Sequence, residues 1–301
     1  MRLFDQLIVK TLPFIPKAVV GMLSKSYIAG DNLDSAIECV KKLNAKGFCV
    51  TMDVLGEFIK SLSQVDESSE TYMKVLDAIQ EHNLDANISI KPTSFGLLLD
   101  EEYCQQALDK IMSKVMQQKN FLRIDMEDSP CTEKTIKLYS TFRETYGQHV
   151  GVVLQSYMKR TINDIQRMTS AGQSNFRICK GIYVEPEEIA YKDYQEVRDN
   201  FLKSLETMFE AGAYVGIATH DDYLVENAKQ LIKKYKLTAD QYEFQMLLGV
   251  RENLRDQILE QGHKVRIYVP FGKDWYGYST RRLKENPALA GTFFKAMFFK
   301  G

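Results

Sequence analysis

The sequence has few residues of the kinds that hold metal ions or build disulfide frameworks. Its 301 residues include five cysteines and four histidines. The cysteines form no CxxC pair and are odd in number, which is typical of reduced thiols in a cytosolic protein. The histidines lack HExxH or comparable spacing, so we predict no metal site.

Neither sign of charge dominates the chain, which carries 39 lysines and arginines against 40 aspartates and glutamates. Without a strong overall field, we expect no nucleic-acid partner. Any recognition of an anion must therefore be local. The chain also lacks a linker rich in Gly, Ser or Pro, so we predict one domain spanning residues 1–301.

A long apolar run is missing as well. The start, "MRLFDQLIVKTLPFIPKAVVGML", is interrupted by Asp5, Lys10, Lys17 and two prolines. It falls short of the roughly 20 apolar residues of a membrane helix, and it has no clear signal-peptide cleavage site. We interpret it as an amphipathic docking helix. The end, "GTFFKAMFFKG", either packs on the fold or contacts a membrane surface. We expect a cytoplasmic protein, with peripheral contact at the inner face of the membrane as the alternative.

What is present is a regular succession of short apolar or β-branched runs. In chain order, the eight candidate strands are "GFCVTMDVLG", "ANISIKPTSFG", "FLRIDMED", "VGVVLQSY", "NFRICKGIYV", "YVGIATHD", "YEFQMLLG" and "KVRIYVPFG". The segments between them carry apolar residues three and four positions apart, as amphipathic helices do. Two such faces consist of Tyr103, Ala107, Leu108, Ile111, Met112 and Val115, and of Leu202, Leu205, Met208 and Phe209.

The sequence also contains a signal for a helix start and a signal for a helix end. Pro186, followed by Glu187 and Glu188, predicts a helix start, because the missing N–H is harmless there and negative charge suits the helix dipole. Gly212 predicts a helix end.

Alternating strands and helices indicate βαβ units and a parallel sheet. Eight regular repeats favour closure into a (β/α)8 barrel of the TIM type over an open doubly wound sheet. A helix around Leu33, Ile37 and Val40 precedes the first strand. We therefore predict an α/β fold with a helical cap at residues 1–46 and a barrel at residues 47–301.

Polar residues stand near the end of nearly every candidate strand, where barrel enzymes place their chemistry. They are Lys91, Asp125, Glu127, Gln155, Arg177, Lys180, Thr219, His220, Gln245 and Tyr268. Each alone is typical of a loop cap or a surface ion pair. Because burying such groups unpaired is costly, the whole set favours a pocket at the barrel mouth.

The stretch "WYGYSTRRLKENP" adds an ionic stripe at helical spacing, made of Tyr278, Arg281, Arg282 and Glu285. Guanidinium groups bind carboxylates with two parallel hydrogen bonds. If this helix follows the last strand, its arginines and Lys91 favour a small anionic substrate or a phosphate-bearing cofactor. The alternative is a surface ladder in which Arg281 pairs with Glu285.

Seven of these motifs, in the same order, resemble those of the proline dehydrogenase family. They are "RIDMED", "VVLQSY", "RICKGIYVEP", "IATHD", "FQMLLG", "RIYVPFG" and "YGYSTRRLKEN", within the range from Asn87 to Asn286. The resemblance implies a distorted (β/α)8 barrel that binds FAD and oxidises L-proline to Δ1-pyrroline-5-carboxylate. It also implies electron transfer to a membrane quinone and a separate pyrroline-5-carboxylate dehydrogenase downstream. No GxGxxG fingerprint is present, so the flavin is expected from the resemblance alone.

The resemblance also implies roles for individual residues. Arg281 and Arg282 would clamp the substrate carboxylate with Lys91, and Tyr278 and Leu247 would line the proline ring. The implied catalytic residues are Asp125, which organises the charged ring, Arg177, near flavin N5, and Tyr268, beneath the substrate. The implied flavin-binding residues are Met126, Gln155, Lys180, Gly181, Ile182, Thr219 and His220. Glu285 has no assigned role, and Cys179, Ile182 and Leu248 depart from the residues common in the family.

Three other readings fit parts of the pattern. A flavin barrel of the methylenetetrahydrofolate reductase type would use a reduced nicotinamide and a pterin. A barrel without flavin would grip a sugar phosphate with Lys91, Arg177 and Lys180. A relative without turnover would act as a binding module.

Overall fold

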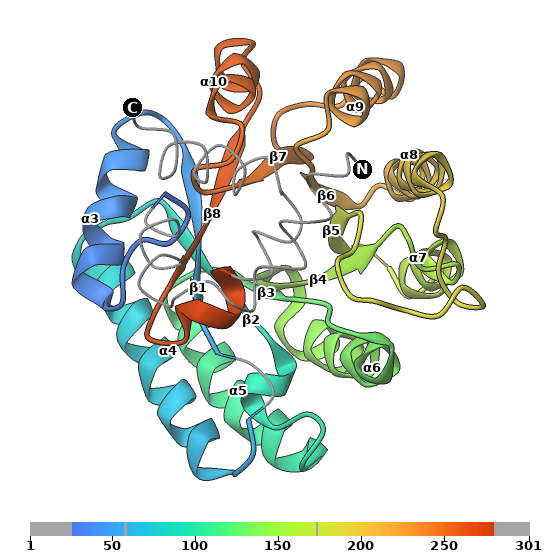
Figure 1. Cartoon of the computed structure of the whole chain (residues 1–301). Helices are drawn as coiled ribbons and strands as arrows, with labels where there is room; N and C mark the ends of the chain where they lie inside the picture. Colours follow the sequence, from blue (N-terminus) through green and yellow to red (C-terminus); the bar gives the residue numbers. More distant parts are fainter. Residues whose placement is uncertain (1–25, 57–58, 173, 280–301) are drawn as a thin grey trace, which may run out of the picture.

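The computed structural model describes residues 26–56, 59–172 and 174–279. In this part of the chain, eight parallel strands form a closed barrel, in the order β1-β2-β3-β4-β5-β6-β7-β8. Figure 1 looks into this barrel, with the strands at the centre and the helices around them. The predicted barrel is therefore confirmed.

The strands are short and coincide with the predicted runs. Their bounds are β1 Cys49–Val54, β2 Ala86–Ile90, β3 Leu122–Ile124, β4 Val150–Gln155, β5 Asn175–Cys179, β6 Tyr214–Ala218, β7 Tyr242–Leu247 and β8 Val265–Phe271. The barrel closes where β1 pairs with β8, from Cys49 opposite Arg266 to Val54 opposite Phe271. The eight strand ends therefore meet at one mouth.

The helices alternate with the strands along the chain. Their bounds are α3 Leu33–Asn44, α4 Ser63–Glu81, α5 Glu101–Gln117, α6 Ser129–Tyr146, α7 Thr161–Thr169, α8 Tyr194–Glu210, α9 Asp222–Lys234 and α10 Glu252–Glu260. Two short 3-10 helices are η2 Pro92–Phe95 and η3 Gly147–His149. Residues 275–279, at the end of the described chain, are helical too.

The two predicted apolar faces belong to α5 and α8. In α5, the buried residues are Cys104, Ala107, Leu108, Ile111, Met112 and Val115. In α8, the buried apolar residues are Phe201, Leu205, Met208 and Phe209. These side chains join the core that lies between the helices and the barrel. Gly212 follows the end of α8 with a φ of +67°, as predicted for a helix stop.

The helix predicted before the first strand is α3. Asn32 caps it by accepting a hydrogen bond of 2.9 Å from the Ser35 N–H. Its buried residues Ala36, Ile37, Val40 and Leu43 belong to the same core, and it packs on β1 and β8, the strands that close the barrel. Residues 1–25 of the expected cap lie outside the described residues.

The helix start predicted at Pro186 is wrong. The Pro186 carbonyl accepts hydrogen bonds from the N–H groups of Ile189 and Ala190, which makes a single turn. Ala190 then forms an antiparallel bridge with Met158, so the backbone leaves the turn extended. The next helix, α8, begins only after Asp193, whose carboxylate accepts two N–H groups of its first turn.

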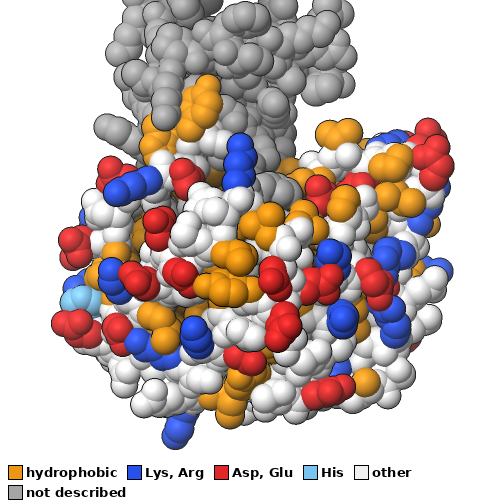
Figure 2. All heavy atoms as spheres, turned by 90° about the horizontal axis from the view of Figure 1, so that it is seen from below, with side chains coloured by type: hydrophobic (Ala, Val, Ile, Leu, Met, Phe, Trp, Pro, Cys, Tyr) orange, Lys and Arg blue, Asp and Glu red, His pale blue; other side chains and the backbone are white. Residues whose placement is uncertain are grey.

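The outer surface carries both signs of charge. On the face shown in Figure 2, Lys and Arg side chains are interspersed with Asp and Glu side chains. This mixture agrees with the formal net charge of −1 for the whole chain.

Candidate active site

Asp125, just after β3, is the centre of a hydrogen-bond cluster at the barrel mouth. Its Oδ1 accepts from Ser89 Oγ and from Arg177 Nη1, both at 2.6 Å. Its Oδ2 accepts from the Tyr268 hydroxyl at 2.7 Å, and Lys91 Nζ lies 3.9 Å away. An ionised carboxylate only accepts hydrogen bonds, so Asp125 fixes three donors from three other strands or strand ends.

Asp53, at the end of β1, is a second acid in this cluster and was missed by the sequence analysis. It is fully buried, and both of its oxygens accept from Lys91 Nζ, at 2.9 and 3.0 Å. Burial raises the pKa of Asp53 to about 6, while Lys91 lowers it and the charge of Asp125 raises it further. The signal was available, because "TMDVLG" also ends an apolar run with a polar residue.

Arg177, on β5, is held on two sides. Its Nη1 donates to Asp125, and its Nε donates to Gln245 Oε1 at 2.5 Å. Its guanidinium carbon also lies 5.2 Å from the centre of the Tyr268 ring. Burial and the charges of Asp125 and Asp53 raise the pKa of Tyr268 well above its usual value, so its hydroxyl remains a donor.

One cavity at the mouth, of about 680 Å³, collects every assigned residue that the structure describes. We call it the mouth cavity. Its assigned lining residues are Lys91, Asp125, Met126, Gln155, Arg177, Lys180, Gly181, Ile182, Thr219, His220, Leu247, Tyr268 and Tyr278. Arg281, Arg282 and Glu285 lie outside the described residues. Tyr278 is buried in a small cluster with Tyr27, Ile28 and Leu55.

Two polar residues of the cavity wall contact the backbone. The Gln155 amide donates to the Met126 carbonyl at 3.2 Å. His220 Nε2 accepts the Leu247 N–H at 2.9 Å, which places the proton of a neutral ring on Nδ1. Both side chains therefore have a fixed orientation toward the cavity.

Asp221 anchors the rim of the cavity. Its Oδ2 accepts from Lys180 Nζ at 2.5 Å, and Arg198 binds both of its oxygens, at 2.8 and 2.9 Å. Burial by itself would raise the pKa of Asp221, but hydrogen bonds from Arg198 and Lys180 hold it well below its usual range. Asp221 also caps α9. The sequence analysis did not assign Asp221 to the site, because its partners Lys180 and Arg198 are distant along the chain.

Gly181 is required at its position for two reasons. Its φ is +103°, which disfavours residues with a side chain, and an added Cβ would lie 2.1 Å from Tyr157 Cδ1. We expect Gly181→Ala to lower the free energy of unfolding by more than about 2 kcal/mol, since strain and overlap act together. Urea denaturation measures this loss.

Gly212→Ala is the matched control for Gly181→Ala. Its φ is +67°, but nothing lies within 4 Å of an added Cβ. Only the left-handed backbone opposes alanine there, at about 1 kcal/mol. Equal losses in the two variants would show that contact with Tyr157 contributes nothing.

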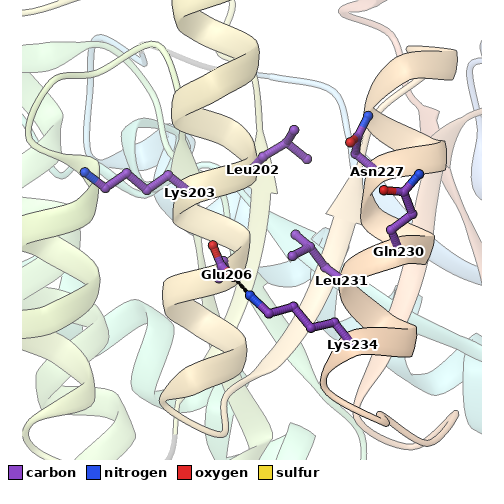
Figure 3. Close-up of a pocket in the computed structure, with 7 residues that line it drawn as sticks. All are labelled: Leu202, Lys203, Glu206, Asn227, Gln230, Leu231 and Lys234. Atoms are coloured by element: carbon purple, nitrogen blue, oxygen red, sulfur yellow. Dashed lines mark hydrogen bonds and ion pairs between the residues drawn. The ribbon is translucent and has the colours of Figure 1, made fainter.

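A second cavity, of about 410 Å³, lies on the flank of the barrel between α8 and α9 (Figure 3). Leu202 and Leu231 form part of its wall, and Lys234 Nζ pairs with Glu206 Oε1 at 2.5 Å. None of the assigned site residues lines it. We therefore locate the candidate active site at the mouth cavity.

The described residues form neither a metal-binding cluster nor a membrane-spanning helix. No group of three His, Cys, Asp or Glu side chains there could hold a metal ion. Within the same ranges, no helix combines the length and apolar character needed to cross a membrane.

A closed parallel barrel with a charged cluster and a cavity at its mouth defines the class of (β/α)8-barrel proteins whose active site lies at the carboxyl ends of the strands. The proline dehydrogenase family model matches residues 36–294. The chain belongs to the proline dehydrogenase family, and is an oxidoreductase.

Individual relatives agree with this assignment. Proline dehydrogenase 1 of Bacillus subtilis (strain 168) is 36% identical over 292 residues, which are 97% of this chain and 96% of that protein. The proline dehydrogenase of Deinococcus radiodurans is 33% identical over 279 residues, 91% of this chain and 90% of that protein.

A solved structure agrees in fold. Proline utilization A (PutA) from Bdellovibrio bacteriovorus, inactivated by N-propargylglycine, matches with a TM-score of 0.84 at 21% identity. The match covers 94% of this chain and 36% of that one, so this chain spans about a third of that protein.

Proposed function

We propose that the protein oxidises L-proline to Δ1-pyrroline-5-carboxylate with FAD and passes the electrons to a membrane quinone. This would be the first step of proline catabolism. One observation carries the proposal beyond family membership: every described residue that the resemblance assigned lines the same mouth cavity, around the Asp125 cluster.

The mouth cavity fits a flavin in size and in its donor set. Its volume, about 680 Å³, lies within the usual range for cofactor sites. Val153, Ala218 and Met246 give it apolar surface, while Gln155 and Lys180 give it polar groups. Bound there, FAD would supply the two-electron acceptor for the hydride that leaves C5 of proline.

Arg177 and Asp125 would act electrostatically in this reaction. Arg177 offers a fixed positive charge where negative charge gathers as electrons arrive. Asp125 holds that guanidinium and the Tyr268 hydroxyl at 2.6 and 2.7 Å. Tyr268 would support the substrate from beneath. All three are thus arranged before the substrate binds, which lowers the cost of reorganisation.

The substrate carboxylate would meet Arg281 and Arg282, with Lys91 as a third cation. Leu247 and Tyr278, both in the wall of the mouth cavity, would contact the proline ring. Oxidation also removes a proton from the ring nitrogen, and nearby cations favour its loss by lowering the pKa of the amine.

Ion pairing at the mouth weighs against the sugar-phosphate alternative. Each of the three cations needed to grip phosphate is already paired with a carboxylate: Lys91 with Asp53, Arg177 with Asp125, and Lys180 with Asp221. A phosphate held by these three cations alone would have to compete with these buried or half-buried pairs, whereas the substrate carboxylate would be bound mainly by Arg281 and Arg282.

The same proposal includes the domain organisation of the protein, its location and the enzyme that acts next. The chain acts as one domain, with a cap at residues 1–46 and a barrel at residues 47–301. Quinone is dissolved in the membrane, so the protein would work in the cytoplasm and contact the inner face of the membrane peripherally. A separate pyrroline-5-carboxylate dehydrogenase would consume the product.

An absorption spectrum of the purified protein, before and after anaerobic L-proline, tests the function. We expect a flavin band that L-proline bleaches and that D-proline, the mirror-image control, leaves in place. A colourless protein would favour the phosphate-binding barrel. A yellow protein bleached by reduced nicotinamide and not by L-proline would favour the methylenetetrahydrofolate reductase type.

A further inference from the structure

Below the mouth cavity, the inside of the barrel contains a layer of charged side chains. Glu243, Arg266 and Arg123 are buried there, where barrels usually hold branched apolar residues. Buried charges are costly unless their hydrogen bonds are satisfied, so a layer of this kind calls for a structural or functional reason.

Part of this layer forms a continuous chain of hydrogen bonds that ends at Arg177. Arg266 Nε donates to Glu243 Oε1 at 2.7 Å, and Gln245 Nε2 donates to the same oxygen at 2.7 Å. The other end of the Gln245 amide, Oε1, accepts from Arg177 Nε at 2.5 Å. This series of hydrogen bonds therefore runs from the barrel interior to the proposed catalytic cluster.

The chemistry of the partners allows only one orientation of the Gln245 amide. An ionised carboxylate accepts only, so Glu243 requires the NH2 end. A guanidinium donates only, so Arg177 requires the oxygen. If the amide were rotated, its oxygen would face the Glu243 carboxylate and its NH2 group would face the Arg177 guanidinium. Glu243 and Arg177 therefore hold the Gln245 amide in one orientation.

Gly216 leaves space for the Gln245 side chain in this series of hydrogen bonds. It lies on β6 between Arg177 on β5 and Glu243 on β7, in register with both. A Cβ added at Gly216 would lie 2.4 Å from Gln245 Nε2. Gly216 is not among the residues with positive φ, so its backbone would accept alanine, and only the side chain of Gln245 excludes it.

We propose that Gln245 is a positioning residue for Arg177, held from below by Glu243 and given room by Gly216. The proposal rests on the proposed function, since Arg177 is the residue assigned to the redox step. Asp125 alone fixes one edge of the guanidinium. The hydrogen bond to Gln245 fixes a second edge of the guanidinium. Together the two bonds set the orientation of the guanidinium plane toward the mouth cavity.

Two variants test the proposal, Gln245→Met and Gly216→Ala. A hydrogen bond to a charged group contributes enough to change a rate about tenfold to a hundredfold. We expect the anaerobic bleaching rate at saturating L-proline to fall by about that factor in both. The half-saturating concentration of proline should change less than about threefold, because the substrate carboxylate is bound elsewhere. Gly216→Ala adds a single methyl group, so it carries the test if Gln245→Met does not fold.

A matched control exists in the same layer. Arg123 passes over Gly151 and donates to Asn175 Oδ1 at 2.5 Å. A Cβ added at Gly151 would lie 2.4 Å from Arg123 Nη1. Asn175→Leu removes an equivalent bond without touching Arg177. It should lower the melting temperature and leave the bleaching rate unchanged.

Three results would overturn the proposal: wild-type rates in both test variants, an equal loss of rate in Asn175→Leu, or a crystal structure of Gln245→Met with Arg177 unmoved. That crystal structure decides the positioning role independently of turnover. Failure of L-proline to bleach the wild-type protein would instead refute the proposed function.

Discussion

Asp125→Ala is expected to lower kcat/KM for L-proline by roughly 150- to 5,000-fold. Breaking a buried ion pair leaves the partner charge uncompensated, at about 3–5 kcal/mol. Here the change removes the acceptor of Arg177 and Tyr268 together, whose bonds to Asp125 measure 2.6 and 2.7 Å. Steady-state kinetics with an artificial electron acceptor, on protein with equal flavin content, gives the ratio.

Glu133→Ala is the control for this loss. Glu133 also accepts hydrogen bonds from two arginines, Arg160 and Arg167, but its side chain is 59% exposed. Exposed pairs contribute at most about 1 kcal/mol, so turnover should match the wild type. If Asp125→Ala kept more than about a tenth of the wild-type kcat/KM, the central role of Asp125 would be refuted.

Asp53 is expected to make the protein less stable as the pH rises from about 4 to about 6. Burial raises the folded-state pKa of Asp53 to about 6, from an ordinary value of 3.8. Well below pH 3.8 the group is protonated in both the folded and unfolded states. As the pH rises, the unfolded chain ionises first, so the free energy of unfolding falls by about 3 kcal/mol before it levels off.

Asp53→Asn isolates this effect. The charged and titratable groups around Asp53 are Lys91, Asp125, Tyr268 and Tyr72, and all of them remain in the variant. Urea denaturation of both proteins at pH 4 and pH 7 gives the difference in unfolding free energy. We expect the wild type to lose about 2 kcal/mol relative to the variant between these values, since part of the full loss has already occurred at pH 4. A difference that stays constant, or that grows in favour of the wild type, contradicts the raised pKa.

The barrel was predictable because its signals are local. Each strand is a short apolar run, and each helix between them repeats its apolar residues every three or four positions. A segment such as 103–115 therefore reveals its buried face without reference to the rest of the chain. The turn at Pro186 shows where this reasoning ends. The local signals there fit a helix start, but the bridge between Ala190 and Met158 keeps the backbone extended.

The site was predictable as a set of residues at strand ends, since closing a parallel barrel brings those ends together. The partners within it were not predictable. Lys91 was expected to help Arg281 and Arg282 bind the substrate carboxylate, but its pairing with Asp53, 38 positions earlier, was not foreseen. Lys180 pairs with Asp221, 41 positions later. Spacing along the chain carries no information about such pairs.

The sequence by itself determined the number of strands, their alternation with helices, and the types of residue at the mouth. Tertiary structure alone decided which charges neutralise one another and which amide holds Arg177. The physical reason is that periodicity specifies the direction of a side chain from its own strand. Closure of the barrel sets the register between strands, and only that register brings Gly216 between Arg177 and Glu243.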